Sequence, residues 1–181
     1  ADQNEYEYDE DRNAEDEYGE VFSRLIRIGN DTYDRESVAE IRVREGVTRI
    51  EARAFRRCKT ASVILPDSLT EIGECAFQRS KLVTINIPDS VTSIEFGTFA
   101  ECRALVSIPS FPPTLTRLGA CAFGNCRALV SIPPFPPALT SIGNGAFGNC
   151  RALVSIPPFP PTLTVIGDCA FVDCRALVSI P

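Results

Sequence analysis

The cysteines are the residues of this sequence whose type and spacing could do chemistry, because thiols form disulfides, bind metals and act as nucleophiles. The chain has 181 residues and eight cysteines, which fall into two columns when the sequence is aligned on a phenylalanine that recurs every 22 or 24 residues. The first column lies three residues after that phenylalanine: Cys58, Cys102, Cys126, Cys150 and Cys174. The second column lies two residues before it: Cys75, Cys121 and Cys169.

The order of the two columns indicates inter-repeat disulfides. Each second-column cysteine follows a repeat that carries a first-column cysteine, and Gly97 takes its place after the repeat in which Ser80 replaces the cysteine. The predicted pairs are Cys58–Cys75, Cys102–Cys121 and Cys150–Cys169, with Cys126 and Cys174 free. Two alternatives stay open, because connectivity does not follow from sequence alone. All eight thiols could be reduced, or Cys121–Cys126 and Cys169–Cys174 could pair within repeats, which leaves Cys75 without a mate.

The chain has no histidine, and this restricts its chemistry. A Ser-His-Asp or Cys-His nucleophile system and a histidine-containing zinc site are excluded. No unlike polar residues converge in the repeats, which offer only copies of one another. We therefore expect no catalytic residue, no cofactor and no metal site, and the protein is not predicted to be an enzyme.

A basic side chain stands four residues after the repeat phenylalanine in every repeat. The six residues are Lys59, Lys81, Arg103, Arg127, Arg151 and Arg175, here called the basic column. In coils stacked at strand spacing, such neighbours lie about 5 Å apart and repel unless they are screened or partnered. The column predicts a ridge that faces an anion, either an acidic protein surface or residues 1–20 of this chain. The alternative is a solvated row of charges copied by duplication.

The elements that position these columns follow one another in a fixed order within each repeat. A strand-like L-x-x-I-x-I and a proline precede L/V-T-x-I/L and, often, a glycine (Gly73, Gly119, Gly143 and Gly167), and x-x-A-F-x-x-C closes the unit. Alternating apolar residues suit a strand with one buried face, and the glycines are expected to permit a positive φ at a corner. The A-F-x-x-C spacing predicts a helical turn.

A period in this range predicts a solenoid, in which stacked copies bury what one copy cannot. Three repeats carry an additional phenylalanine where the shorter units have an aliphatic residue. We expect these three in the core, with an exposed aromatic ladder as the alternative: Phe111, Phe135 and Phe159.

The unit resembles the leucine-rich repeat family, in particular its BspA-like subclass, over residues 37–181. The resemblance implies an α/β fold, namely a right-handed solenoid of about six units with a parallel β-sheet on its concave side and short helical turns on its convex side. It also implies a binding role and no catalytic residue. The strand residues expected to face outward form an apolar stripe that could bind a protein, the alternative being that the stripe only reflects recent duplication: Val106, Val130 and Val154.

Residues 1–20 contain ten acidic residues and one arginine, a net charge of −9, whereas the whole chain is −6, so residues 21–181 are +3. We expect an acidic disordered tail over 1–20, a capping segment over 21–36 with an added strand in 21–28, and the solenoid over 37–181. No apolar run is long enough to span a membrane. The mild charge of the body, without clustered aromatic and basic residues, argues against nucleic acid as a partner.

Two functions compete. The first is a non-catalytic protein–protein interaction module, and the second is a structural or accessory subunit of a larger assembly, whose neighbours cover the C-terminal edge and the acidic tail. The partner is a protein in both. The cysteine content favours a secreted or cell-surface location, or an organelle lumen reached by a cleaved targeting peptide.

Overall fold

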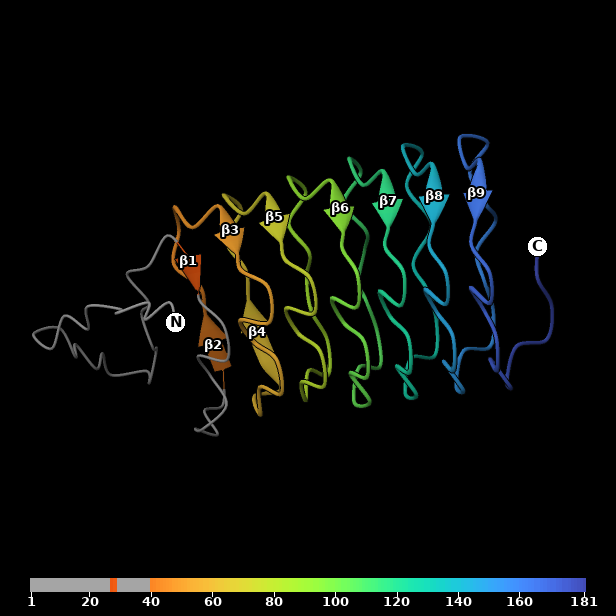
Figure 1. Cartoon of the computed structure of the whole chain (residues 1–181), viewed down its shortest axis with the longest axis horizontal. Coiled ribbons are helices and arrows are strands. Elements are labelled where there is room, and N and C mark those ends of the chain that lie inside the picture. Colours follow the sequence, from red (N-terminus) through yellow and green to blue (C-terminus); the bar gives the residue numbers. More distant parts are fainter. Residues whose placement is uncertain (1–26, 29–39) are drawn as a thin grey trace, which may run out of the picture.

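The computed structural model describes residues 27–28 and 40–181, which form a row of stacked coils, one for each sequence repeat (Figure 1). Every strand is short, and every strand pair is parallel. The strands are β1 (Arg27–Ile28), β2 (Glu40–Arg42), β3 (Arg49–Ile50), β4 (Ser62–Ile64), β5 (Glu71–Ile72), β6 (Ser93–Ile94), β7 (Arg117–Leu118), β8 (Ser141–Ile142) and β9 (Val165–Ile166).

The longest strand ladder runs through the T-x-I/L segment of the repeat. It comprises a three-stranded sheet, β1-β3-β5, and a four-stranded sheet, β6-β7-β8-β9. The register moves by one repeat at each step, so that Ile50 lies beside Ile72 and Leu118 beside Ile142. These aliphatic side chains are buried, whereas their neighbours on the strand face outward or are half-buried.

The L-x-x-I-x-I segment forms a second and weaker ladder. Only β2 and β4 pair there as regular strands, and later coils contribute single bridges, such as the one between Ser131 and Ser155. Prolines directly after this segment, such as Pro133 and Pro157, lack the N–H that a longer strand would need. The expectation of one sheet on this segment is therefore only partly right. The right-handed sense of the coil and the concave placement of the sheet stay predictions.

The A-F-x-x-C segment is not the helical turn that its spacing predicts, because the described residues contain no helix. Instead, its backbone N–H groups donate alternately to the next coil and to a residue three positions earlier in the same coil. The N–H of Phe55 donates to the carbonyl of Ala76 in the next coil at 2.7 Å, whereas the N–H of Cys58 donates back to Phe55 at 3.1 Å. Since alternate donors serve the neighbouring coil, the i to i−4 pattern of an α-helix cannot form.

Positive φ angles also break helical continuity in this segment. In the second coil, for example, Cys75 has φ 54° and Arg79 has φ 61°. Left-handed residues at intervals of four convert the segment into a series of turns. The fold is thus a solenoid of short parallel strands and turns.

Two phenylalanine ladders fill the core. The repeat phenylalanines stack with centroids 5.0 to 5.5 Å apart, and the first five are fully buried: Phe55, Phe77, Phe99, Phe123 and Phe147. Phe111 and Phe135 are buried and form a second stack with Phe159, which is partly buried against the core. The expectation that these three residues are core is met. Their spacing fixes the distance between coils at roughly that of paired strands.

The repeat glycines have a different role from the one expected. Gly73, Gly119, Gly143 and Gly167 do not have positive φ. A Cβ at Gly143 would lie 2.5 Å from the backbone nitrogen of Ala120 in the preceding coil, and the other three are as tightly placed. Glycine is needed there because two backbones approach closely.

The predicted N-terminal segments fall largely outside the described residues. The acidic tail over 1–20 lies outside them altogether, as does most of the capping segment over 21–36. Within that segment the structure describes β1, which pairs with β3 and lies at the end of the longer ladder. The role of 21–36 as a cap stays a prediction.

Candidate functional site

The first-column thiols bond to main-chain carbonyls of the preceding coil. The Sγ of Cys126 lies 3.2 Å from the carbonyl oxygen of Phe99, and Cys150 and Cys174 make the same contact at 3.2 Å one and two coils further on. All five first-column cysteines are buried. The same carbonyls also accept main-chain N–H groups, as Phe99 does from Cys102 at 3.2 Å. Each thiol is therefore a small core side chain that adds one weak donor to a carbonyl that already has a partner.

Burial lowers the reactivity of three of these thiols. Loss of solvation raises the pKa of Cys102 and of Cys150 to about 12, and it raises that of Cys126 well above its ordinary value. Because the thiolate is the reactive form, a raised pKa disfavours reaction at these three cysteines at neutral pH.

The second column alternates between cysteine and glycine from coil to coil. Cys75, Gly97, Cys121, Gly145 and Cys169 occupy the same position, all with φ between 53° and 60°. A Cβ on Gly97 would meet the Sγ of Cys75 at 3.1 Å, and a Cβ on Gly145 would meet that of Cys121 at 3.6 Å. Each of these thiols thus fills the space beside the glycine of the following coil. The alternation of cysteine with Gly97 and Gly145 is visible in the sequence. That all five positions share a positive φ could not be predicted from it.

None of the eight cysteines, all of which lie in the described part of the chain, forms a disulfide. The inter-repeat pairs Cys58–Cys75, Cys102–Cys121 and Cys150–Cys169 are not formed, and neither are the in-repeat pairs. The physical reason lies in direction: the Cys102 and Cys150 thiols face carbonyls of the preceding coil, whereas their predicted mates lie in the following one. The reduced arrangement is the one the structure contains.

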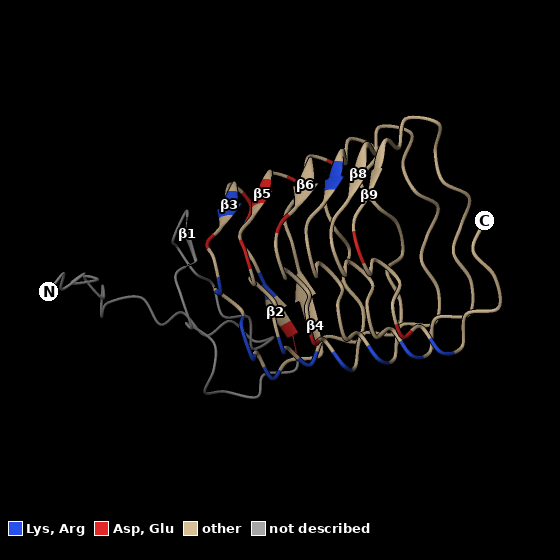
Figure 2. Ribbon diagram, turned by 45° about the vertical axis from the view of Figure 1, so that its right-hand side comes forward, with Lys and Arg blue, Asp and Glu red and all other residues tan. Residues whose placement is uncertain are grey.

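Lys and Arg residues gather along one edge of the coil stack (Figure 2). The basic column contributes one of them in each repeat. All six side chains are exposed. In the part of the chain that the structure describes, only Arg103 has an acidic side chain within ion-pair distance, Glu101 at 3.5 Å. Two unit charges 4 Å apart in water repel by about 1 kcal/mol, so a row of uncompensated cations stores a modest repulsion that a bound anion would relieve.

The charges on the longer strand ladder are compensated, in contrast to the basic column. Arg49 pairs with Glu71 at 3.2 Å, across neighbouring strands β3 and β5. Arg117 on β7 pairs with Glu95 at 2.6 Å. The two charged rows of the solenoid therefore differ: one is neutralised within the coil stack, and the other presents its charge to solvent.

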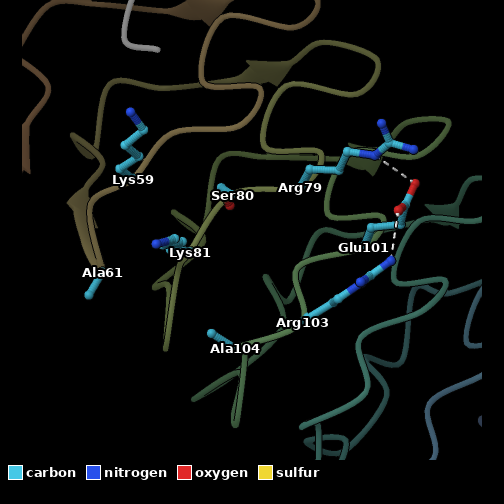
Figure 3. Close-up of a pocket in the computed structure, with 8 residues that line it drawn as sticks. All are labelled: Lys59, Ala61, Arg79, Ser80, Lys81, Glu101, Arg103 and Ala104. Carbon is cyan, nitrogen blue, oxygen red and sulfur yellow. Dashed lines mark hydrogen bonds and ion pairs between the residues drawn. The ribbon is translucent and has the colours of Figure 1, made fainter. Parts of the chain in front are cut away.

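A shallow open depression of about 720 Å³ lies at the N-terminal end of the basic column (Figure 3). Lys59, Lys81, Arg79 and Arg103 contribute cations to its lining, and Glu101 contributes the one carboxylate. Glu101 bridges Arg79 at 3.0 Å and Arg103 at 3.5 Å, as the dashed lines show. Among the described residues the two lysines make no such ion pair, so they are the cations available to an anion that enters the depression.

The predicted apolar stripe is also present. Val106, Val130 and Val154 are 43 to 44% exposed, and each donates its N–H to the valine carbonyl one coil before, at 2.9 to 3.2 Å. Val83 and Val178 extend this valine column at its two ends and were missed from the sequence. In the longer repeats each valine follows the basic residue of its coil by three positions, so the valine and basic columns run side by side along the stack.

Among the described residues, no group of three or more cysteine, aspartate and glutamate side chains could hold a metal ion. The same described residues contain no helix that is long and apolar enough to cross a membrane. What the site offers is a regular, exposed surface of valines and cations.

Comparisons with known proteins agree with this architecture. The model of the BspA type leucine-rich repeat region matches six copies over residues 26–154 and 133–181. A leucine-rich repeat protein of T. pallidum is 30% identical with a TM-score of 0.74, covering 87% of this chain and 71% of its own. Among curated proteins no match was found.

Two further solved structures are similar. A leucine-rich repeat protein of Bacteroides ovatus is 28% identical with a TM-score of 0.66, over 81% of this chain and 44% of its own length. A leucine-rich cell surface protein of Faecalibacterium prausnitzii is 22% identical with a TM-score of 0.48, over 89% of this chain and 59% of its own. The chain spans less than two thirds of the length of either protein.

Proposed function

This chain belongs to the BspA-type leucine-rich repeat family, and from that membership we propose that it is a non-catalytic protein–protein interaction module. Proteins of this repeat family are typically non-catalytic and generally bind proteins, since stacked repeats present extended surfaces. The observation that carries the proposal is the pair of adjacent exposed columns, one of valines and one of cations. The partner would bury the valines and neutralise the cations.

Energetics favours this surface over the rest of the coil. A continuous apolar stripe that is nearly half-exposed over several coils is costly in water, at about 25 cal/mol for each Å² left unburied. The longer strand ladder has paired charges instead, so it has less to gain from a partner. A partner with an apolar ridge flanked by acidic residues fits the two columns.

A second candidate is a subunit of a larger assembly. It is supported by the apolar side chains that stay exposed along the stack, among them Val83, Val106 and Val130, which a neighbouring subunit could cover. The native mass in the source distinguishes the two, because a subunit migrates with its complex. A secreted, cell-surface or organelle-lumen location is part of the same proposal.

The test is affinity capture with matched baits. Val130→Asp with Val154→Asp disrupts the valine column, and Arg127→Glu with Arg151→Glu disrupts the basic column. Phe96→Asp is the control, since Phe96 is 48% exposed but lies two residues after β6, in the other ladder. The partner identified with the native chain should be lost with both double variants and retained with the control. Equal recovery with all baits would contradict the proposal.

A further inference from the structure

We propose that the basic column is the docking surface of the acidic segment 1–20 of the same chain. The segment would lie along the coil stack, with its carboxylates facing successive cations. This docking needs no external partner, so its failure would leave the proposed function standing, and the reverse is also true. Its consequence is regulatory, because a docked segment competes with any acidic partner for the same cations.

Charge complementarity is the first argument. Five cations of the column have no ion-pair partner among the described residues: Lys59, Lys81, Arg127, Arg151 and Arg175. Residues 1–20 carry a net charge of −9, while the rest of the chain is +3. The chain thus contains one strongly acidic segment and one uncompensated basic row. Their association removes the repulsion within each of them.

Spacing is the second argument. The phenylalanine ladder sets the step between coils at 5.0 to 5.5 Å. An extended chain advances roughly 3.3 to 3.6 Å per residue, so alternate side chains lie roughly 7 Å apart on one face. Glu5, Glu7 and Asp9 alternate in this way with Tyr6 and Tyr8. Long lysine and arginine side chains can absorb the small difference in spacing.

Reach is the third argument. A segment of 20 residues spans at most roughly 70 Å when extended, which exceeds the length of five coil steps. The described chain begins with β1, which pairs with β3, the strand of the coil that carries Lys59. The chain therefore enters the stack at the end at which the basic column begins, and six residues separate β1 from the end of the acidic segment.

The depression at that end supplies the first contact. Glu101 already holds Arg79 and Arg103, so the uncompensated groups in the lining are the ammonium groups of Lys59 and Lys81 (Figure 3). A carboxylate from the segment can approach both lysines from solvent because the depression is open. The remaining acidic residues then extend over the arginines of the later coils.

Zero-length cross-linking of the full chain tests this directly, because Lys59 and Lys81 are the chain's two lysines. A carbodiimide joins a lysine amine to a carboxylate that is in contact with it. At low ionic strength, the monomer should yield peptides that join Lys59 or Lys81 to acidic residues within 1–20. These products should disappear toward 1 M salt, where the Debye length is about 3 Å.

Variants test whether the arginines of the basic column, and not only its two lysines, hold the acidic segment. Arg127→Glu with Arg151→Glu should lower the yield of the Lys81 cross-link several-fold, although Lys81 itself is unchanged. Arg117→Glu is the control, since Arg117 is an exposed arginine on β7, in the other ladder, and should leave the yield unchanged. Circular dichroism confirms that the variants fold. Cross-links found only between molecules, only to carboxylates in 40–181, or at equal yield in both variants would overturn the proposal.

Discussion

The hydroxyl of Ser80 lies 3.2 Å from the thiol of Cys102, and that thiol lies 3.0 Å from the carbonyl oxygen of Phe77. Ser80 occupies the first-column position, where five other coils have cysteine, and it is 3% exposed. One coil further on, Cys126 makes the equivalent carbonyl contact with Phe99. The column therefore accommodates a small side chain with a donor, either a hydroxyl or a thiol.

Ser80→Cys should accordingly be tolerated. We expect the stability to change by less than about 1 kcal/mol, whereas Ser80→Ala should lose about 1 kcal/mol, the typical net worth of one hydrogen bond. The midpoint of urea unfolding measures both. Ser110→Ala is the control, because Ser110 is exposed and should shift the midpoint little. A loss of several kcal/mol in Ser80→Cys would show that the column cannot accept a thiol here.

Thiol labelling of the native protein should follow burial. Cys169 is exposed and should be alkylated first, Cys121 is half-buried and should follow, and Cys126 and Cys150 should react only after unfolding. The reason is that a buried thiol is both inaccessible and protonated. Mass spectrometry of the alkylated peptides gives the order. A non-reducing map that joins the peptides of Cys102 and Cys121 would contradict the free-thiol structure.

Stability should fall as the pH rises above about 8.5, where an unfolded thiol begins to ionise. Burial raises the pKa of Cys102 and Cys150 to about 12 in the folded protein. Between these values the unfolded chain loses protons that the folded chain retains, so alkaline pH favours unfolding. Each such thiol contributes up to about 1.4 kcal/mol per pH unit.

Cys150→Ala tests this dependence. The variant is less stable at pH 7 because it leaves a small cavity, but its stability should fall less steeply between pH 8.5 and 10. Urea unfolding at a series of pH values gives both slopes. Parallel curves for the native chain and the variant would mean that the Cys150 thiol does not couple folding to pH.

The solenoid architecture could be predicted from the sequence because every repeat packs in the same way. The 22- and 24-residue periods predicted stacking, and the buried ladders of Phe99 and Phe111 follow from it. The predictions for the glycines and the cysteines were wrong because their roles depend on the path of the backbone rather than on residue type. The role of Gly143 depends on its approach to Ala120, and the thiol of Cys126 is directed at a carbonyl, which no alignment of side chains reveals. The exposure of the basic and valine columns was predictable because it follows from the repeat period. The ion pair between Glu101 and Arg79 was not predictable, because it depends on how neighbouring coils are placed.

The phenylalanine ladder should dominate stability. Phe99 is fully buried and stacks on Phe77 at 5.3 Å and on Phe123 at 5.1 Å. Phe99→Ala should therefore cost about 3 to 5 kcal/mol, from lost burial and the cavity left behind. Phe96→Ala is a matched control three residues away, since Phe96 is 48% exposed and should cost well under half as much. Similar losses in the two variants, measured by thermal or urea unfolding, would contradict a core centred on this ladder.

The contact between Cys75 and Gly97 gives the last prediction. Gly97 and Gly145 both have φ 60°, so replacing either with alanine incurs the same backbone strain, about 1 to 2 kcal/mol. The new methyl group differs in its neighbour: it would lie 3.1 Å from the Sγ of Cys75 in Gly97→Ala, but 3.6 Å from that of Cys121 in Gly145→Ala. Gly97→Ala should thus be the more destabilising. In a Cys75→Ala background, which removes the sulfur, this excess should shrink, with a coupling of about 0.5 kcal/mol or more. Equal losses of stability in Gly97→Ala and Gly145→Ala, together with additive effects in the double variant, would show that the Cys75 thiol moves aside at no cost.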